Sequence, residues 1–192
     1  MSAVLPVSAM RRVTCAELRT LAAAYRPALH YAAARCACET KVYLHWTAGH
    51  YGQFFADYHV QVDADGGIYV IGDGVLDDVL AATYRRNSGS VNIALLGCVG
   101  ATTDDLGCEP PTAAQIEALA QAVTALAAGL WLTIDKERIL THGEARTTRT
   151  AYLPTRPTVR APPASVGIWS TSVQRSAPSS THGRRTERAA AM

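Results

Sequence analysis

Two long segments of the chain have the spacing of apolar residues that is typical of helices. Segment 16–35 is rich in Ala and Leu, and Thr14 with Glu17 three residues later matches a capping box. We expect a helix there, with Pro27 as a break or kink. A second helix is predicted from Pro111 or Thr112 onward. Its expected apolar stripe consists of Ile116, Leu119, Ala120, Val123, Leu126 and Leu130.

Strand patterns lie between these helices and after them. Lys41–His45 reads as a strand, and Tyr58–Val62 and Ile68–Ile71 alternate around an Asp-Gly-Gly turn, which predicts a hairpin. Ser90–Gly100 is a continuous apolar run, as expected for a central buried strand. A short strand or turn then leads to His142. This order predicts an α/β fold: a single domain with a mixed central β-sheet flanked by helices.

Composition changes abruptly near residue 146. Residues 1–145 hold ten Lys and Arg against fifteen Asp and Glu, a net charge of −5; residues 146–192 hold eight Arg against one Glu, a net charge of +7. Five of the nine prolines lie in this second part, which shows neither strand nor helix periodicity. We therefore divide the chain into an N-terminal helical segment (1–40), a domain (41–145) and an irregular basic tail (146–192).

Several classes of protein are disfavoured by what the sequence lacks. No apolar run of membrane-spanning length is present, and the N-terminus lacks a signal-peptide pattern, so we expect a protein made in the cytoplasm without membrane insertion. The arginines of the tail are not interleaved with aromatic residues, so no nucleic-acid partner is expected. The five cysteines fit no zinc spacing and read as reduced thiols, although Cys98 and Cys108 would close a loop under oxidising conditions. A monomer is expected.

Histidines are the candidate chemical groups. His45 and His142 both lie at the ends of predicted strands, and two such histidines converge on one metal ion if their strands are neighbours. Catalytic zinc needs three protein ligands and holds a water molecule in its fourth position. The alternative, a packed core histidine, is the commoner state. His50 and His59 read as structural or rim residues.

Four motifs in a fixed order bear on whether His45 and His142 are metal ligands or packed core residues. "HWTAG" after a strand, "DYHVQVDADGGIYV", "RRNSGSVNIALLG" and "THGEA" together resemble the zinc-dependent N-acetylmuramoyl-L-alanine amidases of the type 2 family. That family includes phage endolysins and the related peptidoglycan recognition proteins. The resemblance covers Lys41 to Ala145. It implies an amidase-like catalytic domain, a Zn²⁺ cofactor and peptidoglycan as the partner.

The resemblance also implies roles for single residues. His45 and His142 would be zinc ligands, and Tyr58 would lie near the zinc-bound water, although a tyrosine packed on the sheet remains open. Glu144 would orient His142 through a hydrogen bond, with a solvated turn carboxylate as the alternative. The reaction would be hydrolysis of the amide between N-acetylmuramic acid and L-alanine of the stem peptide.

The implied substrate groove would be lined by Trp46, Tyr51 and Asn87, of which Asn87 alternatively caps a turn. A protein of this kind acts on the cell wall, for example as a phage or prophage lysis protein. Its cytoplasmic synthesis without a signal peptide would then require a separate route to the wall.

The chain departs from the family pattern after "HGEA". The third zinc ligand is an Asp, Cys or His further along the chain, commonly the Asp of a Trp-Asp-Leu. This chain has no Asp after Asp135, and after His142 its sole remaining histidine is His182. Many members also place a histidine near Ala82, which is absent here. The alternatives are a non-catalytic peptidoglycan-binding module that lost its third ligand, or a product that folds poorly.

A change of reading frame would explain the departure. Val166–Ser172 can be encoded as GTT GGG ATC TGG AGT ACC TCG. Read from the last base of the preceding codon, this becomes Arg-Trp-Asp-Leu-Glu-Tyr-Leu, which resembles the family segment that supplies the third ligand. We hypothesise that the gene, or its recorded sequence, is frameshifted just after Glu144.

Overall fold

The computed structural model describes residues 3–102 and 104–147. These residues belong to one compact unit, residues 1–156, to which all statements below refer. Apart from Arg146 and Thr147, the predicted basic tail lies outside the described residues, as does Val166–Ser172, on which the proposed change of frame was argued.

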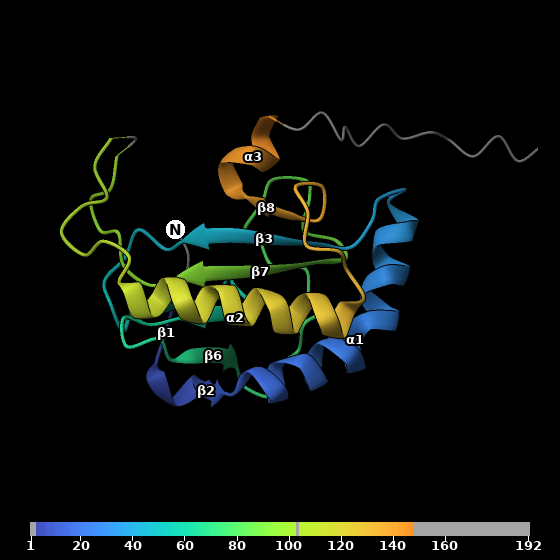
Figure 1. Ribbon diagram of the computed structural model, residues 1–192, viewed down its shortest axis with the longest axis horizontal. Helices are drawn as coiled ribbons and strands as arrows, with labels where there is room; N and C mark the ends of the chain where they lie inside the picture. The colour runs from blue at the N-terminus through green and yellow to red at the C-terminus, as the bar shows by residue number, and fades with distance from the viewer. Residues whose placement is uncertain (1–2, 103, 148–192) are drawn as a thin grey trace, which may run out of the picture. The chain divides into compact units, whose positions relative to one another are not determined.

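A six-stranded mixed sheet forms the centre of the unit, with the strand order β2-β6-β5-β7-β3-β8 (Figure 1). Strands β5, β7, β3 and β8 are parallel to one another, and β6 pairs antiparallel with β5 and with β2. Two further strands, β1 (Val4–Leu5) and β4 (Phe54–Phe55), pair apart from this sheet. The six strands of the main sheet are β2 (Met10–Val13), β3 (Lys41–Trp46), β5 (Val60–Val62), β6 (Ile68–Ile71), β7 (Ser90–Leu95) and β8 (Ile139–Thr141). The predicted hairpin and central strand are confirmed, whereas β1, β2 and β4 were not predicted.

Two long helices, α1 (Cys15–Arg35) and α2 (Ala113–Leu130), pack against each other and against the same face of the sheet (Figure 1). The predicted capping box at Thr14 and Glu17 is present, and Thr112 caps α2 in the same way with Gln115. Of the break or kink that we expected at Pro27, the break is excluded, because α1 continues through this residue. Figure 1 shows α1 bending along its length. The predicted fold class, a mixed sheet flanked by helices, is confirmed.

The predicted stripe of α2 is partly wrong. Ile116 is 51% exposed and Ala120 is also exposed, whereas Val123, Leu126 and Leu130 are buried as expected. Gln115 takes the buried position instead, and its side chain amide donates hydrogen bonds to the carbonyl oxygens of two strand ends. Small residues on the same side of α2 allow α1 to approach closely. The length and composition of α2 would suffice to cross a membrane, but half of the helix is buried here as a core helix.

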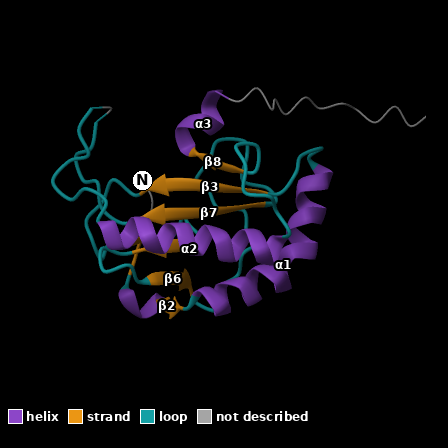
Figure 2. Cartoon of the chain, viewed as in Figure 1, coloured by secondary structure: helices purple, strands orange, loops and turns teal. Residues whose placement is uncertain are grey.

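The two faces of the central sheet differ in character. On the helix-covered face, β3, β5 and β7 present apolar side chains that pack under α1 and α2; these are Val42, Leu44, Val60, Val62, Val91, Ile93 and Leu95. On the opposite face the same strands present mainly polar side chains, namely Tyr43, His45, Gln61, Ser90 and Asn92, which are also buried. We call this second face the loop-covered face, because the segment that contains β4 and the loop of residues 78–87 contact its side chains. Figure 2 distinguishes these loops from the helices and strands.

Candidate active site

The carboxyl ends of two parallel strands bring His45 and His142 together. Leu44 of β3 pairs with Thr141 of β8, so the next residue of each chain segment, His45 and His142, lies at the same end of the sheet. Their ring centroids are 5.2 Å apart, and the rings meet edge to face. We expected His142 to end the last strand. Instead it begins the short helix α3 (His142–Thr147). The two histidines that the sequence analysis singled out are therefore neighbours in the folded chain.

His45 is buried among polar groups of the loop-covered face. It is 9% exposed, and its Nε2 lies 3.2 Å from Oδ1 of Asn92 and 3.3 Å from Oγ1 of Thr83. Burial lowers the pKa of His45 to about 4, a shift that the Asn92 hydrogen bond partly opposes. The ring is therefore neutral at pH 7. Sequence reasoning missed both partners, although a polar residue inside the apolar run of β7 was a signal for Asn92.

Tyr58 is the third side chain at this site. Its ring centroid lies 5.3 Å from that of His45, and the residue is half-buried. Burial, with a smaller contribution from the nearby Asp57 carboxylate, raises the pKa of the Tyr58 phenol above its usual range. The hydroxyl group therefore keeps its proton at neutral pH and is able to donate a hydrogen bond.

Glu144 lies in the first turn of α3 and caps that helix. Its carboxylate accepts hydrogen bonds from the backbone N–H and the hydroxyl of Thr141, both at 2.9 Å. The hydrogen bond from the Thr141 backbone N–H is the main cause that lowers the pKa of Glu144, and the hydrogen bond from the Thr141 hydroxyl lowers it further. The backbone N–H of Glu144 donates in return to the Thr141 hydroxyl at 3.2 Å, and this capping box fixes the start of α3, and thereby the position of His142.

The three residues expected to line a groove occupy different settings. Trp46, at the end of β3, is 53% exposed. Tyr51 ties two loops together: its backbone N–H donates to the Glu109 carboxylate at 2.5 Å, and its hydroxyl donates to the Pro110 carbonyl oxygen. Asn87 accepts a hydrogen bond from the backbone N–H of Thr83 at 2.8 Å, and so shapes the loop before β7.

Two further histidines of the loops have structural partners. His59 is 1% exposed; its Nδ1 accepts from the backbone N–H of Asn92 at 3.0 Å, and its Nε2 donates to the Asp78 carbonyl oxygen at 2.9 Å. His50 is exposed, with its Nδ1 3.0 Å from the Glu109 carboxylate. Neither histidine is brought to the His45–His142 pair by these contacts.

The donor set fits part of a catalytic zinc site. A neutral His45 and a neighbouring His142 are two suitable nitrogen ligands. Among residues 3–102 and 104–147, however, no group of three His, Cys, Asp or Glu side chains is placed to hold a metal ion. Among the described residues, His45 and His142 could therefore act as two of the three ligands that such a site requires.

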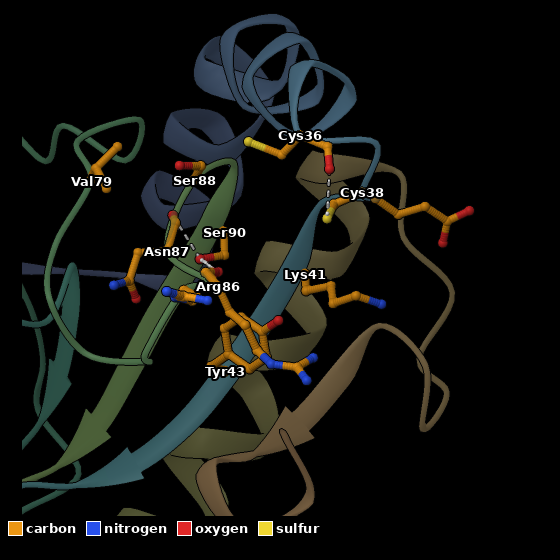
Figure 3. Close-up of a pocket in the computed structure, with 11 residues that line it drawn as sticks. Cys36, Cys38, Lys41, Tyr43, Val79, Arg86, Asn87, Ser88 and Ser90 are labelled. Atoms are coloured by element: carbon orange, nitrogen blue, oxygen red, sulfur yellow. Dashed lines mark hydrogen bonds between the residues drawn. The ribbon is translucent and has the colours of Figure 1, made fainter. Parts of the chain in front are cut away.

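A cavity of about 560 Å³ lies at the amino ends of β3 and β7, the ends opposite to the histidine pair, and Tyr43 is part of its lining (Figure 3). It is formed by the segment after α1, the start of β3 and the loop before β7. Its lining includes Cys36, Cys38, Glu39, Lys41, Tyr43, Val79 and residues 85–88 and 90. Apart from Asn87, which was expected to line a groove, sequence reasoning did not identify this cavity, because its cationic side chains come from segments that are distant along the chain.

The family model for N-acetylmuramoyl-L-alanine amidases matches residues 22–154, more than half of the chain. The chain belongs to this amidase family. The match begins within α1 and therefore extends beyond the four motifs on which the resemblance was based. No curated protein matches this amidase-family chain.

Solved structures similar to this amidase-family chain include two endolysins and a peptidoglycan recognition protein. The Ph2119 endolysin from Thermus scotoductus MAT2119 bacteriophage Ph2119 is 21% identical, with 56% of this chain and 73% of the other covered and a TM-score of 0.41. The endolysin N-acetylmuramoyl-L-alanine amidase LysCS from Clostridium intestinale URNW is 18% identical, with 57% and 71% covered and a TM-score of 0.39. Human PGRP-IBETAC, in complex with glycosamyl muramyl pentapeptide, is 18% identical, with 58% and 74% covered and a TM-score of 0.40.

Proposed function

We propose that this chain is a peptidoglycan hydrolase that cleaves the amide between N-acetylmuramic acid and L-alanine of the stem peptide. The observation that carries the proposal is the convergence of His45, His142 and Tyr58 at one end of the sheet, in a member of the amidase family. His45 and His142 would be two ligands of a zinc ion. Zinc bound there would supply Lewis-acid activation of the amide carbonyl and of a water molecule.

The histidine pair is suited to this role by its protonation and its support. Because burial keeps the pKa of His45 at about 4, the imidazole needs no deprotonation before it ligates a metal near pH 7. The Asn92 side chain oxygen accepts from Nε2 of His45, which leaves Nδ1 as the ring nitrogen with a free electron pair. Asn92 and Thr83 thus fix the orientation of the ring.

Tyr58 would act on the substrate. Its raised pKa keeps the phenol protonated, so it would donate a hydrogen bond to the oxygen that gains negative charge when water attacks the carbonyl. The loop-covered position of His45, beside the half-buried ring of Tyr58, limits the access of bulk water to that hydrogen bond.

Hydrolysis of purified cell walls tests the proposal. The full chain, supplied with zinc, is expected to release stem peptides whose L-alanine carries a free amino terminus, as identified by mass spectrometry. His142→Ala should abolish release, and Tyr58→Phe should lower the rate by about 10²–10⁴-fold. Tyr84→Phe is the matched control, because Tyr84 is 81% exposed. Products that retain the bond between N-acetylmuramic acid and L-alanine would refute the assignment.

A second candidate is a peptidoglycan-binding module without catalysis. The absence of a third candidate ligand beside His45 and His142 among the described residues favours this alternative, because a catalytic zinc ion requires three. A chain that sediments with cell walls but releases no peptide, with or without zinc, would support this alternative.

The proposed change of reading frame bears on the same choice. The nucleotide sequence of the gene decides it: an open alternative frame after Glu144 that encodes Arg-Trp-Asp-Leu would supply the missing ligand. A frame interrupted by stop codons would reject the hypothesis.

A further inference from the structure

We propose that Cys38 is a thiol-modification site, to which the cavity at the amino ends of β3 and β7 directs anionic low-molecular-weight disulfides such as glutathione disulfide. Two partly exposed thiols and three cationic side chains share the lining of this one cavity. The inference goes beyond the proposed function and does not depend on it, because it concerns the end of the sheet opposite to the histidine pair.

Two of the five cysteines line the cavity (Figure 3). Cys36 and Cys38 are free and partly exposed, so both thiols are open to reagents in solution. The cavity volume of about 560 Å³ lies within the range of about 300–1,000 Å³ that is usual for small-molecule sites. One half of a disulfide of the glutathione type therefore finds space beside these thiols.

The cavity is positively charged. Lys41, Arg85 and Arg86 contribute to its lining. Among the described lining residues the one carboxylate is that of Glu39, which is paired with Arg138 at 3.3 Å. A concave site lined by one sign of charge raises the local concentration of ligands of the opposite sign. An anionic disulfide is therefore attracted to this cavity, whereas a cationic disulfide is repelled.

Tyr43 relates the Cys38 thiol to the cationic side chains. Burial raises the pKa of the Tyr43 phenol; Arg86 opposes this shift through its charge and a hydrogen bond, and Cys38 adds to it. Arg86 and Cys38 therefore lie within electrostatic range of the same phenol. The Cys38 Sγ also lies 3.3 Å from the carbonyl oxygen of Cys36, to which it donates. We therefore assign the reaction to Cys38 rather than to Cys36.

The backbone holds this thiol and the arginine loop in a fixed relation. The N–H groups of Ala37 and Cys38 donate to the carbonyl oxygens of Ala34 and Ala33, both at 3.0 Å, which is the Schellman pattern that ends a helix. Gly89, after the arginines, has φ +70°, and a Cβ atom there would lie 2.4 Å from the backbone nitrogen of Ala33. The arginine loop thus packs directly against the end of α1 that leads to Cys38.

The reaction is a thiol–disulfide exchange. The Cys38 thiolate attacks one sulfur atom of the disulfide, so that a new S–S bond forms and the S–S bond of the reagent breaks. The other half of the reagent leaves as a thiolate and takes up the proton that Cys38 released. Cys38 is thereby oxidised and half of the reagent is reduced, so no further oxidant is needed. Nearby cations favour this step, because the attacking and the leaving sulfur both carry negative charge.

The other cysteines provide internal controls. Cys108 is exposed, and Asp104, Asp105 and Glu109 are close to it along the chain, so its surroundings are acidic rather than basic. Cys98 is 1% exposed and should stay unmodified as long as the chain is folded. A preference for anionic disulfides is therefore expected at Cys38 and not at Cys108.

The test compares glutathione disulfide, which is anionic, with cystamine, which is cationic, on the full chain at neutral pH. Peptide mapping by mass spectrometry gives the rate of modification at each cysteine. The ratio of the two rates at Cys38, divided by the same ratio at Cys108, cancels the difference in intrinsic reactivity between the reagents. We expect this quotient to favour glutathione disulfide by at least about tenfold at low salt and to fall as salt is added.

Variants separate the role of charge from that of the thiol. Lys41→Gln and Arg85→Gln should each reduce the quotient, whereas Arg12→Gln, on the edge strand β2, is the matched control and should leave it unchanged. Cys38→Ser should lose the adduct and Cys36→Ser should keep it. Thermal unfolding of the variants, expected to match the parent chain, shows that a lost preference does not reflect a lost fold.

Three results would overturn the proposal. The first is a quotient near unity at low salt, or one that salt does not change; this measurement uses the parent chain alone. The second is an adduct on Cys36 in place of Cys38. The third is the absence of an adduct at Cys38 while Cys98 stays protected. Wall hydrolysis, measured separately, continues to test the proposed function whichever result is obtained.

Discussion

The two faces of the central sheet are both buried, but they are built from different side chains and covered in different ways. The face under α1 and α2 is closed by apolar packing, with residues such as Val42, Val91 and Ile93 fully buried. The loop-covered face buries His45, Gln61 and Asn92 instead, and these side chains hydrogen-bond to one another or to the loops.

The difference shows where stability and chemistry reside in this fold. Apolar burial stabilises one face without specifying any ligand. Buried polar groups on the other face need defined partners, and those partners orient the groups that would act on a substrate. Substitutions on the two faces should therefore differ in kind: loss of stability on the first, loss of ligand binding on the second.

The largest loss of stability is expected from Ile93→Ala on the helix-covered face. Ile93 is fully buried in the central strand, and removal of its side chain leaves a cavity. The free energy of unfolding should fall by about 2–5 kcal/mol, as measured by denaturant titration. Val79→Ala, at a residue that is 64% exposed, is the control and should change it little. Equal losses in the two variants would contradict the assignment of the core.

Asn92→Leu, one position earlier in the same strand, should affect metal binding more than folding. The substitution removes the acceptor of the His45 hydrogen bond, and zinc affinity should fall by about 10–100-fold. Stability should change less than in Ile93→Ala, because Nδ2 of Asn92 has no hydrogen-bond partner among the described residues and its loss costs little. Calorimetry with zinc measures the affinity. An unchanged affinity would show that His45 does not depend on Asn92.

The pH dependence of stability should report the buried His59. Burial lowers the pKa of His59, so the folded state keeps the ring neutral while the unfolded state takes up a proton below about pH 6.5. The stability associated with neutral His59 is therefore present above that pH and declines on acidification, by at most about 1.4 kcal/mol per pH unit. His59→Gln retains an acceptor and a donor but does not titrate, so its stability should decline less steeply between pH 6.5 and 5. Identical slopes in both proteins would be inconsistent with a neutral buried ring.

A smaller effect is expected at the start of α1. Thr14 and Glu17 form a reciprocal capping box, with the Thr14 backbone N–H 2.7 Å from the Glu17 carboxylate. Thr14→Ala should reduce the free energy of unfolding by about 1 kcal/mol in chemical denaturation. Thr20→Ala, within the same helix and exposed, serves as the control. The cap would be unimportant if the two variants unfolded alike.

The elements with local signals could be predicted from the sequence. Periodicity and capping residues gave α1 and α2, and the Asp-Gly-Gly turn gave the hairpin of β5 and β6. The edge strand β2 was missed because its pairing with β6 is set by tertiary contacts rather than by a pattern of its own. Ile116 was misassigned because α2 turns a buried glutamine toward the strand ends, a preference that hydrophobic periodicity does not encode.

The candidate site was predicted in part: residues marked by a local pattern were identified, and residues whose role depends on tertiary contacts were not. His45 and His142 were found from their positions at strand ends, and the parallel pairing of β3 with β8 brings them together. Asn92 and Thr83 were not found, because their role depends on which side chains meet on the loop-covered face. The basic cavity escaped notice because Lys41 and Arg85 meet only in the folded chain.

The central claim, that the loop-covered face carries a zinc site of an amidase, is tested most directly by the metal content of the purified full chain. Elemental analysis after dialysis against a weak chelator should find about one zinc ion per chain. The same analysis of His45→Ala and His142→Ala should find almost none. A parent chain without retained zinc, or variants that retain as much as the parent, would contradict the claim and leave a peptidoglycan-binding role as the remaining candidate.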